Sequence, residues 1–518
     1  MQKALNLMNE MCRVIVDMER SGIRIDTDAL EELEITYKKE LVILKSRLEH
    51  LAVESLGDTP FKLTSNDDLS MLIFSRKPTS KKKWAEVFNL GTEFVNGSRK
   101  SKRPIHIKGN MLAAKIQNLS YVIHKTTAKQ CPSCKGKGKV ARKKRDGTWG
   151  KPRYNCNLCG GCGIDYDVDY NTVAGFRQKV INTNDLAAHG YKCGKEQLER
   201  LSRRAKGDAK EFLTGMVRFN AISHYLTSFI EGIKQNVGRD GILHTQFMQC
   251  VTATGRLSSR SPNFHNQPRG GTFPIRKVII SRWSKGCITE ADYAQLEFRV
   301  AAALSKDETA LQDIIDGVDV HARTAKILTQ YGQETSRQDA KTHTFKPLYG
   351  GMSGSIAEQK YYKEFLARYK GIKSWHNKIL EKAASMKTLS LPTGRQYKFP
   401  WAKVNTMGYV AGATKIKNYP VQGFATADIV PLATIKLHKK MVDNNMKSCI
   451  INEVHDSIVV DTHPDEIEEM PYLISTAMLT VIVDLMEKYN YEFSVPLEVE
   501  VKQGKNWLDM NVVMEKAT

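Results

Sequence analysis

The sequence predicts an α+β protein made of several subdomains. A chain of 518 residues is long enough to bury more than one large core. Residues 2–55 and 195–237 carry apolar side chains at helical spacing, whereas residues 449–461 contain two apolar, β-rich runs around a short polar break, which is the pattern of a hairpin. Long helices combined with a hairpin of buried strands indicate the α+β class.

The composition favours a polyanionic partner. Lys and Arg number 78 against 56 acidic residues, which gives a net charge of +22, and the pI is near 9.4. An excess of this size is typical of proteins that bind nucleic acid. No apolar run approaches the 18 or more residues of a membrane-spanning helix, and charged residues within 1–20 exclude a signal peptide. We therefore expect no membrane partner and a cytoplasmic, non-secreted protein.

Four cysteines have the spacing of a metal site. Cys131 and Cys134 form one Cys-x-x-Cys pair and Cys156 and Cys159 form another, each followed by glycines that allow the backbone to turn. Ten cysteines in a chain this long favour a reducing compartment and metal over disulfides. The doubled pattern also resembles the zinc modules of DnaJ chaperones. We predict one structural Zn²⁺ in a pair of knuckles at 131–163.

Two basic runs lie in the same region, one before the cysteine pairs and one between them. Residues 99–103 and 142–145 consist almost entirely of Lys and Arg. A run of this kind is most often a solvated loop. Contact with nucleic-acid phosphates is the alternative.

Two carboxylates lie near the ends of predicted strands. A run with strand character begins at 278–280 and ends at 287–288, and Asp292 stands where it stops, just before a helical pattern. Asp456 follows His455 at the turn of the predicted hairpin. Two aspartates that converge repel each other unless a divalent cation lies between them. Two Mg²⁺ ions about 4 Å apart, held in this way, support nucleotidyl transfer; an ordinary surface turn is the alternative for Asp292 alone.

A predicted helix near residue 340 carries two cations and two aromatic rings on one side. Arg337, Lys341, Phe345 and Tyr349 follow one another in steps of four and span roughly 18 Å. The charges suit a triphosphate and the rings suit a base. The alternative is an amphipathic surface helix.

Six motifs resemble, in order, those of family A DNA polymerases, the DNA polymerase I family. They are Thr254–Ser259, Asp292–Arg299, Asp319–Ala325, Arg337–Gly350, Asn418–Gly423 and Val454–Asp456. The resemblance runs from about residue 8 to the end, apart from one insertion. It implies a right-hand polymerase fold with an antiparallel sheet in the palm, helical fingers and a helical thumb.

The resemblance also implies domain boundaries. These are N-terminal helices leading into the thumb at 1–75, a basic insertion at 76–190, thumb helices at 191–250, the first part of the palm at 251–300, the fingers at 301–420 and the second part of the palm at 421–518. An insertion in a subdomain that grips duplex favours phosphate contact, or else it docks a separate exonuclease, helicase or processivity subunit. The compact chain and its 345–351 run resemble phage or viral members, which implies a bacterial or phage-infected host cytoplasm.

The activity implied is template-directed DNA synthesis. The enzyme would add dNTPs to a primer 3′-hydroxyl by two-metal-ion nucleotidyl transfer, releasing pyrophosphate, with primer–template DNA and dNTPs as partners and two Mg²⁺ ions, or Mn²⁺, as cofactors. Family members often carry a proofreading exonuclease ahead of the thumb, and we expect this chain to have none. Asp292, Asp456 and the carbonyl of Tyr293 would bind the metal, and Lys341 would protonate the leaving pyrophosphate.

The resemblance assigns the remaining site residues to the nucleotide and the DNA. Glu297 would lie beneath the sugar and exclude a ribose 2′-hydroxyl by collision. The other residues expected at the dNTP are Gln295, His321, Arg337, Lys341, Phe345 and Tyr349. Those expected at the DNA are Arg256, Asn263, Asn266, Arg299, Gln422 and His455. Several of these polar residues have a simpler explanation as turn formers.

Two departures and two alternatives accompany this assignment. Ser457 replaces the acidic residue that often follows His-Asp, and Pro347 predicts a kink in the nucleotide helix. A single-subunit RNA polymerase is the first alternative, and Glu297 argues against it. A non-catalytic DNA-binding replication subunit is the second, and it is disfavoured by the intact Asp292 and Asp456.

Overall fold

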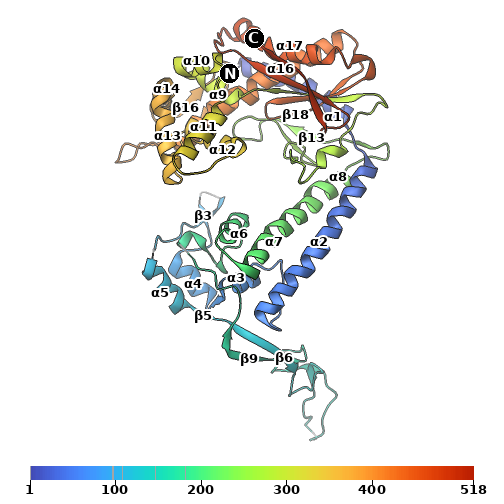
Figure 1. The fold of residues 1–518 in the computed structure, drawn as a ribbon, viewed down its shortest axis with the longest axis vertical. Coiled ribbons are helices and arrows are strands. Elements are labelled where there is room, and N and C mark those ends of the chain that lie inside the picture. The colour runs from blue at the N-terminus through green and yellow to red at the C-terminus, as the bar shows by residue number, and fades with distance from the viewer. Residues whose placement is uncertain (1, 96–97, 108, 146, 181) are drawn as a thin grey trace. The chain divides into compact units, whose positions relative to one another are not determined.

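The computed structural model describes residues 2–95, 98–107, 109–145, 147–180 and 182–518, which form two compact units (Figure 1). Unit 1 comprises Met1–Leu33 and Thr227–Thr518, and unit 2 comprises Glu34–Leu226. Each unit has its own hydrophobic core.

Unit 1 is built on a five-stranded antiparallel sheet with the strand order β18-β19-β15-β20-β21. Its strands are β15 (Cys287–Tyr293), β18 (Cys449–Val454), β19 (Ser457–Thr462), β20 (Glu498–Gly504) and β21 (Met510–Ala517). The central strand β15 pairs with β19 and β20, so that Asp292 faces Ser457 on one side and Glu500 on the other. The hairpin predicted at 449–461 is therefore confirmed as β18 and β19, with His455 and Asp456 at its turn.

Helices pack against this sheet. α1 (Gln2–Ser21) contacts α16 (Val430–Asp443) and β18, while α17 (Met470–Leu479) contacts α16, β15 and β20. α18 (Val481–Tyr489) follows α17, and the π-helix η4 (Phe424–Ile429) leads into α16. The apolar face of α1 buries Leu7, Met11 and Val14, which accounts for its amphipathic sequence.

The segment from 296 to 423 is mainly helical. It contains α9 (Leu296–Ser305), α10 (Glu308–Ile315), α11 (Val320–Gln330), α12 (Arg337–Leu348), α13 (Ile356–Arg368), α14 (Lys370–Met386), the hairpin β16 (Thr388–Ser390) and β17 (Gln396–Lys398), and α15 (Ala413–Gly423). The helix predicted around residue 340 is confirmed as α12, which Ser336 caps by accepting a hydrogen bond from the Asp339 amide. Pro347 lies one residue before the end of α12, where a missing amide proton interrupts little of the helix.

The strand leading to Asp292 differs from the prediction. Residues 275–278 form a 3-10 turn (η3, Ile275–Val278), and Ile279 and Ile280 make only single bridges, to Ile25 and Asn506. The strand begins at Cys287 and runs through Tyr293, so Asp292 lies within the strand and not after it. Pairing on both sides extends β15 to Tyr293 although its sequence is polar there.

One segment departs from the expectation that no apolar run is long enough to cross a membrane. Residues Met470–Tyr489, which span α17 and α18, have the length and hydropathy for a crossing. Half of the most apolar window is buried, and α17 contacts β15 and β20. A core helix of a sheet-containing domain has the same composition.

The short elements of unit 1 connect these layers. They are β1 (Ile23–Arg24), paired with β12 (Ile242–Leu243), β13 (Gln246–Met248), paired with β14 (Ser258–Arg260), α8 (Glu231–Lys234) and η5 (Pro464–Glu466). β1 separates α1 from α2 (Thr27–Leu56), so the region 2–55 contains two helices. α2 and the π-helix η2 (Tyr225–Ile230) cross the boundary between the two units.

Unit 2 combines long helices with most of the predicted insertion. Its helices are α3 (Asn66–Phe74), α4 (Lys81–Phe88), α5 (Gly109–Leu119), α6 (Lys195–Ser202), α7 (Gly207–His224) and the 3-10 turn η1 (Thr183–Asp185). Its short strands are β2 (Arg76–Pro78), β3 (Thr92–Val95), β4 (Ser98–Ser101), β5 (Ser120–Val122), β10 (Leu186–Ala187) and β11 (Gly190–Tyr191). Trp84, Phe88 and Leu112 share one core with Phe212 of α7. Much of the region 76–190 is therefore part of the same packed body as the helices that flank it.

An antiparallel arm leaves this core. It consists of β6 (His124–Gln130) and β9 (Ile164–Val173), with the cysteine segment at its end (Figure 1). A second, shorter pair lies within that segment, β7 (Lys139–Val140) with β8 (Tyr154–Asn155). We call residues 131–163 the tip.

Candidate active site

The sheet of unit 1 brings the two predicted metal-binding aspartates together. Asp292 lies on β15 opposite Ser457, the first residue of β19, and Asp456 lies in the turn directly before it. The Tyr293 amide donates to the Asp456 carbonyl at 3.2 Å, which fixes the turn against the central strand. His455 reaches this turn with a φ of +59° and has an exposed side chain.

The two carboxyl groups are buried next to each other. Burial, followed by the charge of Asp456, raises the pKa of Asp292 well above its usual range, and burial raises the pKa of Asp456. Asp292 Oδ1 is buried without a hydrogen-bond partner among the described residues. A buried oxygen without a donor, beside a second carboxylate, suits a divalent cation, which prefers oxygen ligands.

Sequence reasoning missed a third carboxylate, Glu290. Its Oε1 accepts a hydrogen bond from the Ser457 hydroxyl at 3.1 Å and lies 3.8 Å from Arg276 Nη1. The negative charge of Glu290 also contributes to the raised pKa of Asp292. The signal was the two-residue period of β15, which directs Glu290 and Asp292 to the same face of the sheet.

Arg269 is a second missed residue. Its side chain is exposed, and its positive charge lowers the pKa of both Asp292 and Asp456, against the larger effect of burial. The Pro-Arg-Gly-Gly sequence at 268–271 marks it as a loop residue but gives no sign of its neighbours.

Glu297 lies in the first turn of α9 between two polar partners. Arg256 Nη2 donates to Glu297 Oε1 at 2.6 Å, and the Tyr349 hydroxyl donates to Oε2. Burial raises the pKa of Glu297, while Arg256 opposes that effect. The cluster therefore joins residues from three of the predicted motifs, and the Glu297 side chain is only 14% exposed. Gln295 precedes the helix as its N-cap, with a φ of +53°.

One side of α12 has two cations toward its N-terminus and two aromatic rings toward its C-terminus. These residues are Arg337, Lys341, Phe345 and Tyr349. Arg337 forms an ion pair with Asp319, the N-cap of α11, whereas Lys341 makes no ion pair with a described residue. Phe345 and Tyr349 are stacked, with ring centroids 6.2 Å apart and an interplanar angle of 12°. Cations at one end and rings at the other are consistent with a nucleotide-binding face.

His321 is more enclosed than its predicted phosphate contact requires. It is 6% exposed, its Nδ1 lies 3.0 Å from the Thr344 hydroxyl, and its ring packs edge-on against Phe345. Burial lowers the pKa of His321 to about 4, so the imidazole is neutral at pH 7. A charged contact from His321 to phosphate is therefore disfavoured, and its clearest role is to support Phe345.

The predicted DNA contacts divide into exposed and buried groups. Asn266 is exposed, and Asn263 Oδ1 accepts from the backbone amides of His265 and Asn266, as expected for a turn former. Gln422 reaches the Tyr349 hydroxyl. Arg299 corrects the prediction: it is 5% exposed, and its guanidinium donates to the Ala294 and Pro496 carbonyls and to Glu498. Because these hydrogen bonds use its guanidinium donors, Arg299 holds the start of α9 in place and does not present its guanidinium to DNA.

The four tip cysteines converge as a candidate metal centre. Cys131 and Cys156 have their sulfur atoms 3.8 Å apart, Cys134 and Cys159 have theirs 3.7 Å apart, and all four sulfurs lie within 4.8 Å of one another. A tetrahedral zinc with bonds of roughly 2.3 Å places its sulfurs roughly 3.8 Å apart. Backbone hydrogen bonds, first of all from Cys159, lower the pKa of Cys156 to about 6, which favours a thiolate ligand.

Backbone geometry repeats in the two knuckles. The Gly138 amide donates to Cys134 Sγ and the Gly163 amide donates to Cys159 Sγ, both at 3.2 Å. Both glycines have positive φ, and a Cβ on either would lie within 2.4 Å of a backbone oxygen. The glycines of the doubled motif are therefore required by the turn that presents each sulfur.

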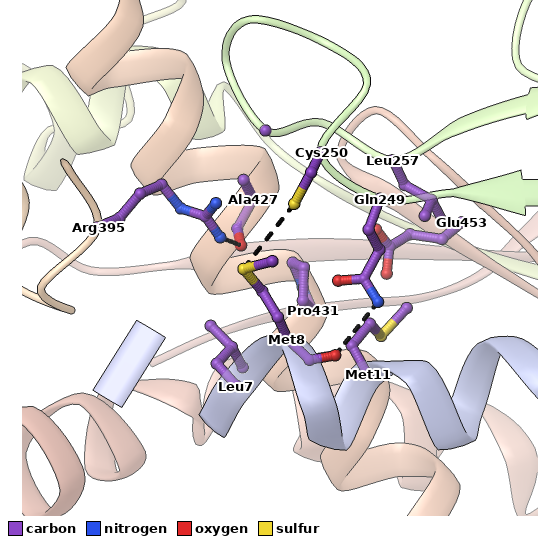
Figure 2. Close-up of a pocket in the computed structure, with 11 residues that line it drawn as sticks. Leu7, Met8, Met11, Gln249, Cys250, Leu257, Arg395, Ala427, Pro431 and Glu453 are labelled. Carbon is purple, nitrogen blue, oxygen red and sulfur yellow. Dashed lines mark hydrogen bonds between the residues drawn. The ribbon is translucent and has the colours of Figure 1, made fainter. Parts of the chain in front are cut away.

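A small cavity lies elsewhere in unit 1 and does not serve as a substrate site. It is lined by α1, the loop around Gln249 and the buried Glu453, and Figure 2 shows the Gln249 amide reaching the Met8 carbonyl, at 3.2 Å. Its volume of about 10 Å³ accommodates no more than roughly one water molecule.

Comparisons with known proteins agree with this arrangement. The sequence pattern of DNA polymerase family A matches residues 175–509. DNA polymerase I of Lactococcus lactis subsp. cremoris is 30% identical over 342 residues, covering 62% of this chain and 37% of that protein. The thermostable DNA polymerase I of Thermus aquaticus is 28% identical over 339 residues, covering 61% and 39%. The chain thus spans less than two fifths of the length of these curated relatives.

A solved structure has a similar fold. It is described as the POL domain of Pol1 from M. smegmatis in complex with DNA primer-template and dNTP. The match has a TM-score of 0.65 at 20% identity and covers 96% of this chain and 70% of the other. The similarity therefore extends over both units, including the part of the chain before residue 175.

Proposed function

The chain belongs to DNA polymerase family A, and from this premise we propose that it carries out template-directed DNA synthesis. It extends the 3′-hydroxyl of a primer with dNTPs and releases pyrophosphate. The observation that carries the proposal is the meeting of Asp292 and Asp456 beside Glu297, whose pKa responds to Asp456.

The metal-binding group consists of Asp292, Asp456 and the carbonyl of Tyr293. The unpartnered Asp292 Oδ1 and the repulsion between the two carboxylates fit two Mg²⁺ ions, or Mn²⁺ in their place. When bound, such ions lower the pKa of the primer 3′-hydroxyl and offset the charge that builds up on pyrophosphate. Lys341, which has no ion-pair partner among the described residues, donates the proton to the leaving pyrophosphate.

The incoming nucleotide lies along α12. Arg337 leaves its exposed ion pair with Asp319 and joins Lys341 at the triphosphate, while Phe345 and Tyr349 lie against the sugar and base. Glu297 occupies the space that a ribose 2′-hydroxyl needs, which selects dNTPs by exclusion.

The DNA lies next to this group. We assign Gln295 and His455 to the primer terminus, and Arg256, Asn263, Asn266 and Gln422 to the DNA strands. Arg256 belongs to both functions, since its guanidinium also holds Glu297. Removing that arginine would therefore affect DNA binding and sugar selection together.

The right-hand organisation of the family gives names to the parts of the chain. We assign residues 251–300 and 421–518 to the palm, 301–420 to the fingers, and 1–75 with 191–250 to the thumb and its approach. The region 76–190 is an insertion in the thumb, and the run 345–351 is the basis for proposing a phage-type member.

One Zn²⁺ ion is held by Cys131, Cys134, Cys156 and Cys159 at the end of the arm. The sulfur separations of 3.7 and 3.8 Å support this assignment. The ion stabilises the fold of the tip, because the short strands and exposed side chains of the tip do not form a hydrophobic core that would do so.

Primer extension tests the proposed activity. The full chain, with Mg²⁺ and a primer–template, should incorporate dNTPs and largely reject rNTPs. Asp456→Ala should abolish extension while leaving duplex affinity within about 3-fold, because only one carboxylate is lost. Extension by rNTPs at the dNTP rate would favour an RNA polymerase, and extension that survives Asp456→Ala would refute the proposed site.

A further inference from the structure

The tip carries a high density of positive charge. Residues 131–163 contain nine Lys or Arg residues and a single acidic residue, Asp146, which lies outside the described residues. The nine are Lys135, Lys137, Lys139, Arg142, Lys143, Lys144, Arg145, Lys151 and Arg153, and all are exposed. None of them forms an ion pair with a described acidic residue. Thirty-three residues thus carry a net charge of +8 out of +22 for the whole chain.

The arm that carries the tip is not charged in this way. β9 presents Asp165, Asp167 and Asp169, and Lys129 of β6 pairs with Asp167. Within the arm and tip, the net positive charge therefore lies in the tip, where like charges repel one another without a described acidic partner. Clustered cations without acidic neighbours are unfavourable in a loop that contacts only water, whereas a surface that binds phosphates uses them to attract its ligand.

Exposed aromatic rings lie among these cations. Trp149 is 70% exposed and Tyr154 is 47% exposed. The Arg142 guanidinium lies over the Tyr154 ring, 4.2 Å from its centroid. Exposure of the Trp149 indole to water is unfavourable, and the ring adds nothing to a hydrophobic core in this loop. Stacking of the indole on a nucleic-acid base would remove its apolar surface from water.

A short hairpin holds Trp149 in place. Lys143 and Trp149 form an antiparallel bridge, the Lys144 amide donates to the Thr148 carbonyl at 2.7 Å, and the Gly150 amide donates to the Arg142 carbonyl at 3.0 Å. These bonds set the indole directly beside the basic run 142–145. Ring and charges consequently form one surface on a backbone anchored by the cysteine centre.

We propose that the tip is a separate binding site for single-stranded nucleic acid, which holds the phosphates with its cations and stacks an unpaired base on Trp149. The site is independent of the proposed polymerase centre, because no residue of that centre belongs to the tip. Unpaired strands fit better than duplex, since the face of the indole is available only to a base outside a helix.

Binding of a fluorescein-labelled oligothymidylate to the full chain, followed by anisotropy, tests the proposal. Trp149→Ala should weaken binding between about 5- and 150-fold, which is the range for loss of one stacked base. The triple variant K143Q/K144Q/R145Q should weaken it and reduce the slope of log affinity against log salt by about 2, at roughly 0.7 for each lost phosphate contact. Quenching of tryptophan fluorescence by the oligonucleotide should be smaller in Trp149→Ala.

A matched control distinguishes binding at the tip from a general effect of the protein's positive charge. The variant K100Q/K102Q/R103Q removes three cations from the other basic run of unit 2, outside the tip, and should change affinity by less than about 2-fold. All variants should keep the zinc content and the primer-extension rate of the unaltered chain at saturating primer–template. Equal losses in both triple variants, or no loss in Trp149→Ala, would overturn the proposal. Tighter binding of a blunt duplex through the same tip residues would overturn the single-strand assignment.

Discussion

The contacts of Glu297 lead to a quantitative prediction for sugar selection. Glu297→Ala removes the carboxylate that accepts hydrogen bonds from Arg256 and from the Tyr349 hydroxyl. Tyr349 is half-buried, and a hydroxyl donor left without an acceptor costs roughly 1–3 kcal/mol when it is shielded from water, or about 5- to 150-fold in rate if the whole loss falls on the transition state. The same substitution opens space for a 2′-hydroxyl. kcat/KM should therefore fall for dNTPs and rise for rNTPs.

The assay is single-nucleotide primer extension with a matched dNTP and rNTP. We expect the dNTP-to-rNTP ratio of kcat/KM to drop by more than about 10-fold in Glu297→Ala. Glu297→Gln is the control, because it keeps the volume of the side chain and an oxygen that accepts from Tyr349, and its ratio should stay within about 3-fold of the unaltered enzyme. An unchanged ratio in Glu297→Ala would show that Glu297 does not lie beneath the sugar.

Three further predictions concern other sites. Phe345→Tyr should raise the use of dideoxynucleotides, because it supplies a hydroxyl in place of the missing 3′-OH; unchanged discrimination in chain-termination assays would remove Phe345 from the sugar. Glu453 is buried and accepts a hydrogen bond from the Thr434 hydroxyl, and burial raises its pKa from 4.5 to about 7. The folded protein therefore favours the protonated carboxyl, and the stability that this provides is fully present below pH 4.5. It is lost as the pH rises through 7, which lowers the free energy of unfolding by about 3 kcal/mol. Glu453→Gln should thus raise Tm more at pH 8 than at pH 5, and an equal effect at both would contradict the argument. A Cys131→Ser/Cys156→Ser variant should lose about one zinc per chain by elemental analysis, whereas Cys162→Ser should keep it.

Local patterns in the sequence predicted the helices and strands of the active site better than the tertiary contacts around them. The hairpin around Asp456 was predictable because two apolar, β-rich runs flank a short polar break, and the helix from Arg337 because its side chains recur in steps of four. The cysteine pairs were predictable because two-residue gaps leave few alternatives to a shared ion.

Residues whose function depends on tertiary packing were not predictable from such patterns. Arg299 has the sequence context of a DNA contact, yet its donors turn to Glu498 and to the Pro496 carbonyl, almost 200 residues later in the chain. Glu290 gave no signal beyond its place in a strand, because its importance comes from Ser457 on the neighbouring strand. Burial of His321 likewise follows from the packing of α11 against α12. Sequence spacing does not report these contacts.

The extent of the insertion shows the same limit. The resemblance implied a basic insertion at 76–190, and within it Trp84 and Phe88 pack into the core shared with Phe212. Among the described residues, those of the arm and tip (124–173) add no side chain to that core, and neither does the exposed hairpin of β3 and β4. Apolar residues scattered through a Lys-rich segment do not reveal which core they join.

Binding of Mn²⁺ tests the central claim most directly, namely that Asp292 and Asp456 hold divalent cations together. The complex should contain a dideoxy-terminated primer, its template and the matching dNTP, so that no bond can form, and bound Mn²⁺ should be counted by electron paramagnetic resonance. We predict that Asp292→Asn and Asp456→Asn each weaken Mn²⁺ binding at least 10-fold while primer–template affinity is retained. Unaltered Mn²⁺ affinity and stoichiometry in both variants would contradict the account.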